Sequence, residues 1–324
     1  MSRKKRRKSE KNINMVLAAN FARRENRRGK SARELRFSRR VDRIRSMRAS
    51  DYPKCSSVLL ELRRRLCNFK AGSLSWGQLI REMRHSAIIV GASSGIGEAL
   101  ARQLHQAGWR IGLLARRTDR LSALASQLGT DVSIDYVDVS KEACAMPFRT
   151  MAKAMGAVDL VILCAGCGHL NPGHESAPDR ETVAVNVSGF MEMARETFLY
   201  FEQQGRGHLA AITSVAALRG NADGAIYAAS KAFQSTYLDG LRDSARRKKL
   251  AICVTELQPG FVDTAMMKTA APLSPLLRRL LVSDAATAAR QMLRAVRRRK
   301  KHAYITRRYA VVAFLLRLLP RPGG

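Results

Sequence analysis

The 324-residue sequence has few aromatic residues, few cysteines and few acidic residues. Phe, Trp and Tyr make up 6% of the chain while hydrophobic residues make up 46%, so a buried core must consist mainly of aliphatic side chains. The six cysteines are scattered and no apolar signal segment opens the chain, which does not favour a disulfide framework. We therefore expect free thiols in a reducing, cytoplasmic setting.

The shortage of acidic residues gives a net charge of +32, from 58 Lys and Arg against 26 Asp and Glu. Residues 1–82 hold 25 of the basic residues and only 7 of the acidic ones. This segment opens with Ser2-Arg-Lys-Lys-Arg-Arg-Lys8 and has no sustained apolar pattern, so it cannot form a core. We expect residues 1–82 to form a disordered basic extension. Three interpretations remain open: untranslated sequence upstream of a start at Met83, an arm that binds nucleic acid or anionic lipid, or a transit peptide.

From Ser86 onward, apolar runs alternate with amphipathic stretches. The apolar runs are typical of buried parallel strands and cover residues 87–90, 111–115, 132–137, 158–163, 208–212 and 251–257. The amphipathic stretches predict helices near residues 95–107, 118–128, 141–156, 179–204 and 225–248. This alternation predicts an α/β fold, a doubly wound parallel sheet that forms a single domain over residues 83–305.

The last residues, 306–324, form a tail of different character. A strand-like run at 303–306 precedes the apolar run 309–316, which lies between arginines. This apolar run is about half as long as a membrane span requires, so it predicts a short apolar helix. Such a helix either contacts a membrane surface peripherally or packs on the core or on a second subunit.

The first expected strand leads into Gly91-Ala-Ser-Ser-Gly95-Ile-Gly97, and a helix follows. Glycines at these positions allow a sharp turn and close approach of the backbone to a pyrophosphate, which the helix N-terminus attracts. The second strand ends at Arg116-Arg117, where an NAD-selective site would carry an acidic residue. Two guanidinium groups suit a 2′-phosphate, so the pattern favours NADPH over NADH, the alternative being a solvated basic loop.

An acid/base pair is indicated by Tyr227-Ala-Ala-Ser-Lys231, which places a phenol and an ammonium on one face of an expected helix. A free tyrosine has a pKa of about 10, and a neighbouring ammonium stabilises the phenolate. Ser214 follows the fifth expected strand, and Asn186 lies in the helix expected at 179–204. Together the four residues are candidates for carbonyl chemistry.

The glycine loop G-x3-G-x-G, followed in order by Asn186, Ser214 and the Y-x3-K pair, resembles the short-chain dehydrogenase/reductase family. The resemblance covers residues 85–265 closely and extends loosely to 305. It implies a Rossmann fold and the reduction of a carbonyl, or the oxidation of the matching alcohol, by an NADPH-dependent oxidoreductase. It further implies a homodimer or homotetramer built on the helices near 179–204 and 225–248.

The resemblance also assigns roles to the catalytic residues. Tyr227 would protonate the substrate oxygen and Ser214 would orient the carbonyl. Lys231 would lower the pKa of Tyr227 and hold the nicotinamide ribose, and Asn186 would anchor a water that links Lys231 to solvent.

The cofactor contacts that the resemblance implies lie at the ends of the expected strands. Asp138 corresponds to the residue that binds the adenine edge, and Cys164 stands where the family has asparagine. That departure, like Val90 in place of threonine, is expected to alter packing and to leave the chemistry intact. The expected contacts are Gly91, Ser93, Ser94, Gly95, Ile96, Gly97, Arg116, Arg117, Asp138, Val139, Cys164, Ala165, Gly166, Tyr227, Lys231, Pro259, Gly260, Val262 and Thr264.

Three further segments of the sequence bear on the substrate and on metal binding. Residues 264–281, rich in Met, Ala and Leu, stand where the family has its substrate-covering loop, and their character favours a hydrophobic or acyl-type substrate. Cys164-Ala-Gly-Cys167 has the spacing of a redox motif, but no second Cys or His pair accompanies it, so no metal is expected. His169 is expected to make loop hydrogen bonds and not to act in catalysis.

A second function of another class is a catalytically retired scaffold that senses dinucleotides or binds nucleic acid. A damaged catalytic set would favour it, and all four catalytic candidates are present.

Overall fold

The computed structural model describes residues 84–265, 267, 274, 278, 279 and 281–318. The basic extension expected at 1–82 and most of the covering loop expected at 264–281 lie outside the described residues.

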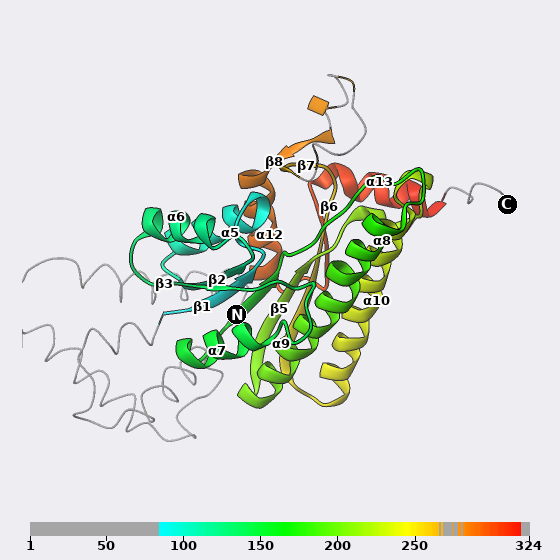
Figure 1. The fold of residues 1–324 in the computed structure, drawn as a ribbon. Coiled ribbons are helices and arrows are strands. Elements are labelled where there is room, and N and C mark those ends of the chain that lie inside the picture. Colours follow the sequence, from blue (N-terminus) through cyan, green and yellow to red (C-terminus); the bar gives the residue numbers. More distant parts are fainter. Residues whose placement is uncertain (1–83, 266, 268–273, 275–277, 280, 319–324) are drawn as a thin grey trace, which may run out of the picture. The chain divides into compact units, whose positions relative to one another are not determined.

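Strands of the described residues form a seven-stranded parallel sheet in the order β3-β2-β1-β4-β5-β6-β9 (Figure 1). They are β1 (Ser86–Val90), β2 (Arg110–Ala115), β3 (Val132–Tyr136), β4 (Leu160–Leu163), β5 (Arg206–Ile212), β6 (Ala251–Pro259) and β9 (His302–Ile305). The short strands β7 (Val262–Asp263) and β8 (Ser283–Asp284) pair separately. The strand order reverses between β1 and β4, where doubly wound sheets bind ligands beyond the strands' carboxyl ends. The predicted doubly wound α/β fold is confirmed.

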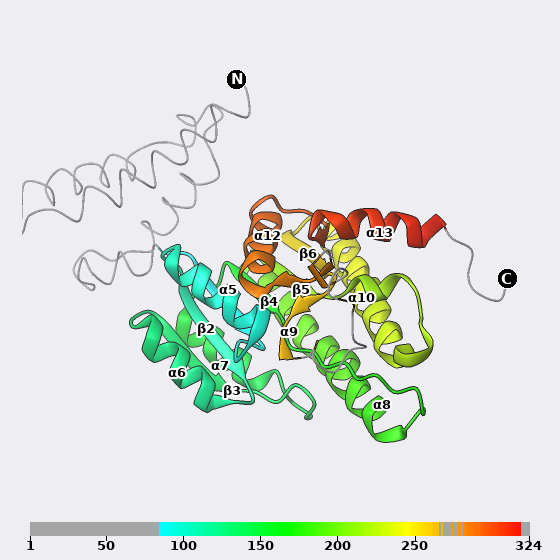
Figure 2. The same ribbon diagram turned by 90° about the horizontal axis from the view of Figure 1, so that it is seen from above.

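Helices cover both faces of this sheet (Figures 1 and 2). They are α5 (Gly95–Gln106), α6 (Thr118–Leu128), α7 (Met146–Met155), α8 (Ser176–Val183), α9 (Phe190–Gln204), α10 (Ala225–Arg247), α12 (Ala285–Arg297) and α13 (Arg307–Leu318). Shorter turns are the π-helical η2 (Ala184–Gly189) and the 3₁₀ segments η3 (Val215–Leu218) and η4 (Ala222–Gly224). Helices α5, α6 and α12 pack on one face, and α7, α9 and α10 on the other.

Alternate residues of β1 show why the strands are apolar throughout. Ala87 and Ile89 pack with α5 and α12, whereas Ile88 and Val90 face the layer of α7 and α9. A strand buried on both faces needs apolar side chains at every position, and β1 has no exposed residue.

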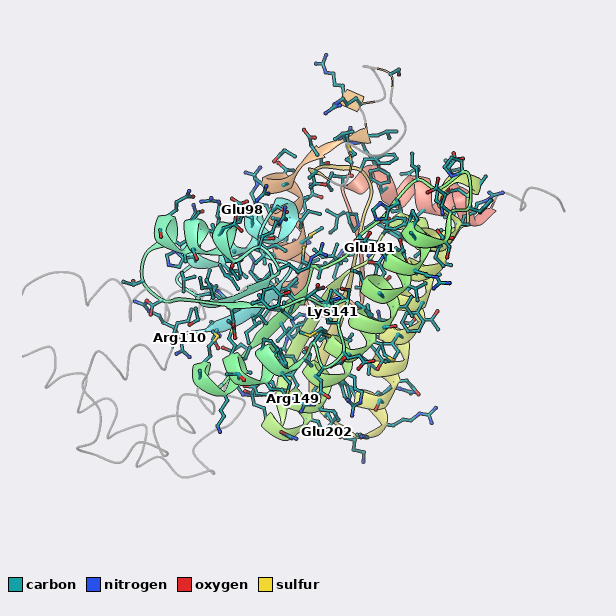
Figure 3. The ribbon with its side chains drawn as sticks, in the orientation of Figure 1. Glu98, Arg110, Lys141, Arg149, Glu181 and Glu202 are labelled. Atoms are coloured by element: carbon teal, nitrogen blue, oxygen red, sulfur yellow. The ribbon has the colours of Figure 1, made fainter. Side chains whose placement is uncertain are left out.

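Charged side chains lie on the outside of the helical layers, as Figure 3 shows for Arg149 and Glu202. Arg149 of α7 lies 2.6 Å from Glu196 of α9, and Lys248 donates to Glu202 at 2.9 Å. The Lys248–Glu202 pair lies at the surface and contributes at most about 1 kcal/mol, whereas Glu196 is buried beneath Arg149.

The helix predicted at 179–204 is divided into α8, η2 and α9. Gly189, the last residue of η2, packs so closely on the backbone carbonyl of Val139 that a Cβ would collide with it. The π-helical turn therefore lies where the helix passes the end of β3. Helix α12 and the ribbon of β7 and β8 were not among the predicted elements.

The short apolar C-terminal helix predicted from the sequence is confirmed as α13. Tyr309 and Ala313 are buried, while Val311, Phe314 and Leu315 are exposed. Among the described residues, no helix combines the length and apolar character that crossing a bilayer requires.

Candidate active site

The glycine-rich loop between β1 and α5 lies against the ends of β2 and β4. Gly91 has a φ of +90° and donates its N–H to the carbonyl of Leu114 at 2.7 Å. A Cβ on Gly91 would lie 2.5 Å from the backbone nitrogen of Ala165, and a Cβ on Gly97 would collide with the carbonyl of Gly91. Only glycine fits these two positions, and the turn leads directly into the N-terminus of α5.

Arg117, just after β2, is joined to this loop. Its guanidinium donates to the hydroxyl of Ser93 at 3.0 Å and to that of Ser94 at 2.7 Å. Burial lowers the pKa of Arg117, and repulsion from Arg120 and Arg116 acts in the same direction. An anion placed beside Ser93 and Ser94 would relieve this repulsion.

Asp138 follows β3 and its carboxylate is held by Ser140, whose backbone N–H and hydroxyl donate to it at 3.0 and 2.7 Å. Burial opposes ionisation, but the Ser140 bonds, Arg116 and Lys141 outweigh it and hold the pKa of Asp138 below its ordinary value. Asp138 is therefore an ionised acceptor at neutral pH. The next residue, Val139, is the buried neighbour of Gly189.

Beyond β4, the chain continues alongside the glycine loop. The N–H of Cys164 donates to the carbonyl of Val90 at 2.8 Å. Burial raises the pKa of the Cys164 thiol to about 12, so it is a thiol and not a reactive thiolate. Cys164 and Cys167 are both free, as expected for this strand end. A Cβ on Gly166 would lie 3.3 Å from both Asn186 Oδ1 and Lys231 Nζ, so glycine keeps this position open.

Asn186 is fully buried in the π-helical turn and all of its side-chain bonds are internal. Its Oδ1 accepts from the N–H of Cys167 at 3.0 Å, and its Nδ2 donates to the Cys167 carbonyl at 2.7 Å and to Ser230 Oγ at 3.1 Å. The side chain thus fixes the segment after β4 to α10. π-Helical turns within helices occur frequently at functional sites.

Tyr227 and Ser214 meet at the start of α10. Ser214 follows β5 and its hydroxyl is hydrogen-bonded to the phenol of Tyr227. Burial raises the pKa of Tyr227, and the Ser214 bond opposes the rise only in part. The resemblance implied a lowering by Lys231; in this arrangement burial dominates, so the phenol is protonated at neutral pH.

Lys231, one turn further along α10, is buried beside the same phenol. Its Nζ lies 5.7 Å from the centroid of the Tyr227 ring and donates to Oε1 of Gln234 at 3.0 Å. Burial lowers the pKa of Lys231 to about 8, and the neighbouring Cys167 and Cys164 act in the opposite direction. The ammonium is thus poised to exchange its proton near neutral pH.

The segment after β6 closes the other side of the site. A Cβ on Gly95 would lie 3.0 Å from Cγ2 of Thr264, which places this threonine against the glycine loop. Gly260 lies under the ring of Tyr309 from α13, where a Cβ would collide with the ring. Tyr309 accepts from the N–H of Phe261 at 3.0 Å and donates to the Leu281 carbonyl at 3.1 Å.

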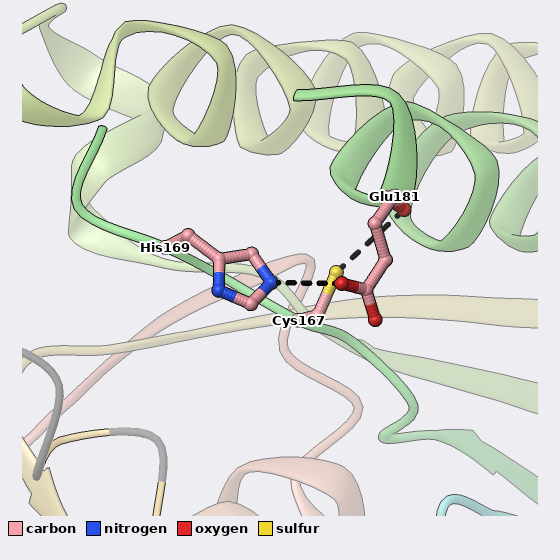
Figure 4. A group of neighbouring side chains, drawn as sticks. All are labelled: Cys167, His169 and Glu181. Atoms are coloured by element: carbon pink, nitrogen blue, oxygen red, sulfur yellow. Dashed lines mark hydrogen bonds and ion pairs between the residues drawn. The ribbon is translucent and has the colours of Figure 1, made fainter. Parts of the chain in front are cut away.

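His169 and Glu181 lie beside Cys167, in the segment after β4 and in α8 (Figure 4). His169 Nε2 lies 3.2 Å from Glu181 Oε2, and the Cys167 thiol donates to the Glu181 backbone carbonyl at 3.8 Å. Their ligand-type atoms lie within 4.8 Å of one another, a spacing that could suit a metal ion. His169 and Glu181 already pair with each other, and both are substantially exposed.

Contacts join two groups of the sequence-predicted residues. The glycine loop meets Arg117 and Thr264, and Lys231 lies beside Tyr227 and, like Asn186, beside Gly166. Sequence reasoning missed Gln234 and Tyr309. Gln234 follows Lys231 by three positions, so helical spacing could have placed its side chain near the ammonium. Nothing in the sequence links Tyr309 to Gly260.

Comparison with known proteins gives a consistent result. The sequence profile of the short chain dehydrogenase family matches residues 85–273. An uncharacterized oxidoreductase of Mycobacterium tuberculosis is 31% identical over 232 residues, which cover 68% of this chain and 88% of that protein.

Two solved structures have a similar fold. An alcohol dehydrogenase from the archaeon Thermococcus sibiricus, complexed with 5-hydroxy-NADP, is 26% identical with a TM-score of 0.59, covering 68% of this chain and 95% of that one. A 3-ketoacyl-(acyl-carrier-protein) reductase from Brucella melitensis, complexed with NADH, is 23% identical with a TM-score of 0.60, covering 65% and 90%. The chain belongs to the short-chain dehydrogenase/reductase family and is an NAD(P)-dependent oxidoreductase.

Proposed function

We propose that this protein transfers a hydride between NADPH and the carbonyl or alcohol carbon of a hydrophobic or acyl-type substrate. The observation that carries the proposal is the convergence of Ser214, Tyr227 and Lys231 beside a glycine loop that is joined to Arg117. Because the catalytic set is complete, a retired sensor is not favoured.

The residues present fit a dinucleotide. Gly91, Gly95 and Gly97 carry no Cβ at the turn from β1 into the α5 N-terminus, where backbone N–H groups can bind a pyrophosphate. The open position at Gly166 lies beside Lys231, which would hold the nicotinamide ribose. Asp138 would accept from the adenine, and Pro259, Gly260, Val262 and Thr264 would border the nicotinamide.

The preference for NADPH rests on charge. Arg116 and Arg117 stand at the end of β2, and Arg117 already bonds two serine hydroxyls of the glycine loop. A 2′-phosphate would accept from guanidinium groups that repel each other in its absence. The 2′-hydroxyl of NADH would leave that repulsion in place.

When bound, the nicotinamide supplies or accepts the hydride, and the chain's own residues handle the proton. Tyr227 is protonated at neutral pH because burial raises its pKa, so it can donate its proton to the oxygen of a carbonyl under reduction. Ser214 would donate a hydrogen bond to the same oxygen and orient it. The reverse reaction would need the Tyr227 phenolate, which the Lys231 ammonium would stabilise.

The finer assignments of substrate, assembly and setting are part of the proposal. The apolar segment 264–281 favours a hydrophobic substrate. We propose a homodimer or homotetramer through α9 and α10 and a cytoplasmic location, with α13 available for peripheral membrane contact through exposed Val311, Phe314 and Leu315. Residues 1–82 would contribute nucleic-acid contacts only if they are part of the translated protein.

The test is NADPH oxidation by the full chain against aldehydes, ketones and 3-oxoacyl thioesters of increasing chain length. We expect turnover that rises with chain length, and short-chain selectivity would contradict the substrate class. Binding of NADPH without turnover of any panel member would contradict the oxidoreductase proposal.

Cofactor preference is tested with Arg117→Ala. Removal of one charge-assisted hydrogen bond to phosphate should lower kcat/KM for NADPH by about 10- to 100-fold and leave the value for NADH nearly unchanged. Arg290→Ala is the matched control, because Arg290 is exposed on α12 and donates to the hydroxyl of Thr287 in the same helix at 2.8 Å. Equal losses with both cofactors would assign Arg117 a structural role.

A further inference from the structure

Gln234 bridges two members of the candidate catalytic set. Its Oε1 accepts from Lys231 Nζ at 3.0 Å, and its Nε2 donates to the backbone carbonyl of Asn186 at 2.9 Å. All three residues are buried, and Gln234 has no exposed surface. The bridge spans 48 residues of sequence and joins α10 to the π-helical turn η2.

The orientation of this amide is fixed by chemistry. An ammonium can only donate and a backbone carbonyl can only accept, so the amide oxygen must face Lys231 and the NH₂ must face Asn186. A flipped amide would place like groups together at both ends. Gln234 therefore does what a water molecule between the same two groups would do: it accepts from one and donates to the other.

We propose that Gln234 is a positioning residue: its amide holds the Lys231 ammonium and ties it to the backbone of the π-helical turn at Asn186. The inference rests on the proposed function, because it concerns the same site. Because an amide does not ionise near neutral pH, the Gln234 oxygen stays available to accept from the Lys231 ammonium across that pH range.

The other groups around the Lys231 ammonium are neutral side chains. The groups that act on it electrostatically are the thiols of Cys164 and Cys167, from the segment after β4. Tyr227, on the same helix, presents its ring to the ammonium at 5.7 Å. These neighbours are neutral at neutral pH, since burial raises the pKa of each thiol and of the phenol. Within the described part of the chain, Gln234 is thus the group that accepts a hydrogen bond from the Lys231 ammonium.

The experiment uses two variants with opposite effects on the full chain. Gln234→Leu removes both bonds at similar volume, so the Lys231 ammonium loses its acceptor and its pKa should fall. Gln234→Glu keeps an oxygen toward Lys231 and adds negative charge, so the pKa should rise. Gln204→Leu is the matched control, because Gln204 bridges the backbone carbonyls of Val158 and Arg206 in another part of the fold.

Two readouts separate this inference from the proposed function. The first is the titration of Lys231 by NMR of ¹³Cε-labelled lysine, with the resonance assigned by its loss in Lys231→Met. The second is the pH profile of kcat/KM with NADPH. We expect shifts of the Lys231 pKa in opposite directions in the two Gln234 variants, a loss of kcat of about tenfold or more in Gln234→Leu, and no shift in Gln204→Leu.

The outcomes are distinct. Opposite shifts of the Lys231 titration without turnover of any substrate would support the bridge and contradict the proposed function. Turnover in the wild type, with an unchanged Lys231 titration and pH profile in both Gln234 variants, would overturn the inference. If Gln234→Leu fails to fold, the isosteric Gln234→Glu alone decides, since the inference requires its Lys231 pKa to rise.

Discussion

At the scale of single residues, the absence of a side chain on Gly168 leaves room for the ring of Tyr227. A Cβ on Gly168 would lie 2.7 Å from the Tyr227 ring, which is well inside van der Waals contact. Gly168→Ala should displace the phenol from Ser214 and lower kcat by about 100-fold or more, because a small misplacement of a reacting group is costly. The measurement is kcat together with the melting temperature.

The control is Gly173→Ala, because a Cβ at Gly173 would have nothing within 4 Å. Full activity in Gly168→Ala would contradict this role of Gly168.

The catalytic candidates could be predicted from the sequence because order and spacing identify them. Tyr227 and Lys231 lie one helical turn apart, and Ser214 follows an apolar strand. The role of Gln234 could not be predicted, because it depends on a contact with the Asn186 carbonyl that only the folded chain creates. The raised pKa of Tyr227 likewise comes from burial, which spacing does not reveal.

At the scale of elements, α13 supports the site through one side chain. The Tyr309 hydroxyl bonds the backbone of Phe261 and of Leu281, and its ring covers Gly260. Tyr309→Phe keeps the ring and loses both bonds, so we expect a loss of about 1–3 kcal/mol in the free energy of unfolding and a higher KM for NADPH. Thermal unfolding and cofactor titration measure these effects.

The control for Tyr309→Phe is Tyr304→Phe in β9, which removes a hydroxyl from the same region. An unchanged KM in Tyr309→Phe would show that α13 stabilises the fold without ordering the cofactor segment.

The elements themselves could be predicted where the chain has a clear period. Strands β1, β2 and β4 are buried on both faces and consist of apolar runs, so their positions agree with expectation. The helix predicted at 179–204 is present as the contiguous α8, η2 and α9, but its π-helical turn was not predicted, because the close approach of Gly189 to Val139 leaves no mark in the apolar pattern.

At the scale of the whole molecule, stability should fall on acidification. Burial lowers the pKa of His208 to about 4, with Arg299 acting in the same direction. Between that value and the ordinary histidine value of 6.5, the unfolded chain binds more protons than the folded one, so stability is present above this window and is lost as pH falls through it. The loss is at most about 3 kcal/mol.

Urea unfolding at several pH values between 4 and 7 measures this dependence. His208→Gln keeps a polar group toward Thr255, whose hydroxyl lies 2.8 Å from the imidazole, and cannot take up a proton. The variant should show a flatter dependence than the wild type. The same slope in both would place the acid sensitivity elsewhere.

In the proposed reaction Tyr227 supplies the proton for carbonyl reduction, and a comparison of two hydroxyl deletions on α10 tests this role. Tyr227→Phe and Tyr237→Phe each remove one phenol oxygen from the same helix. The account predicts that Tyr227→Phe binds NADPH normally and loses at least about 100-fold in kcat, whereas Tyr237→Phe keeps wild-type turnover. Turnover by Tyr227→Phe at the wild-type rate would contradict the account.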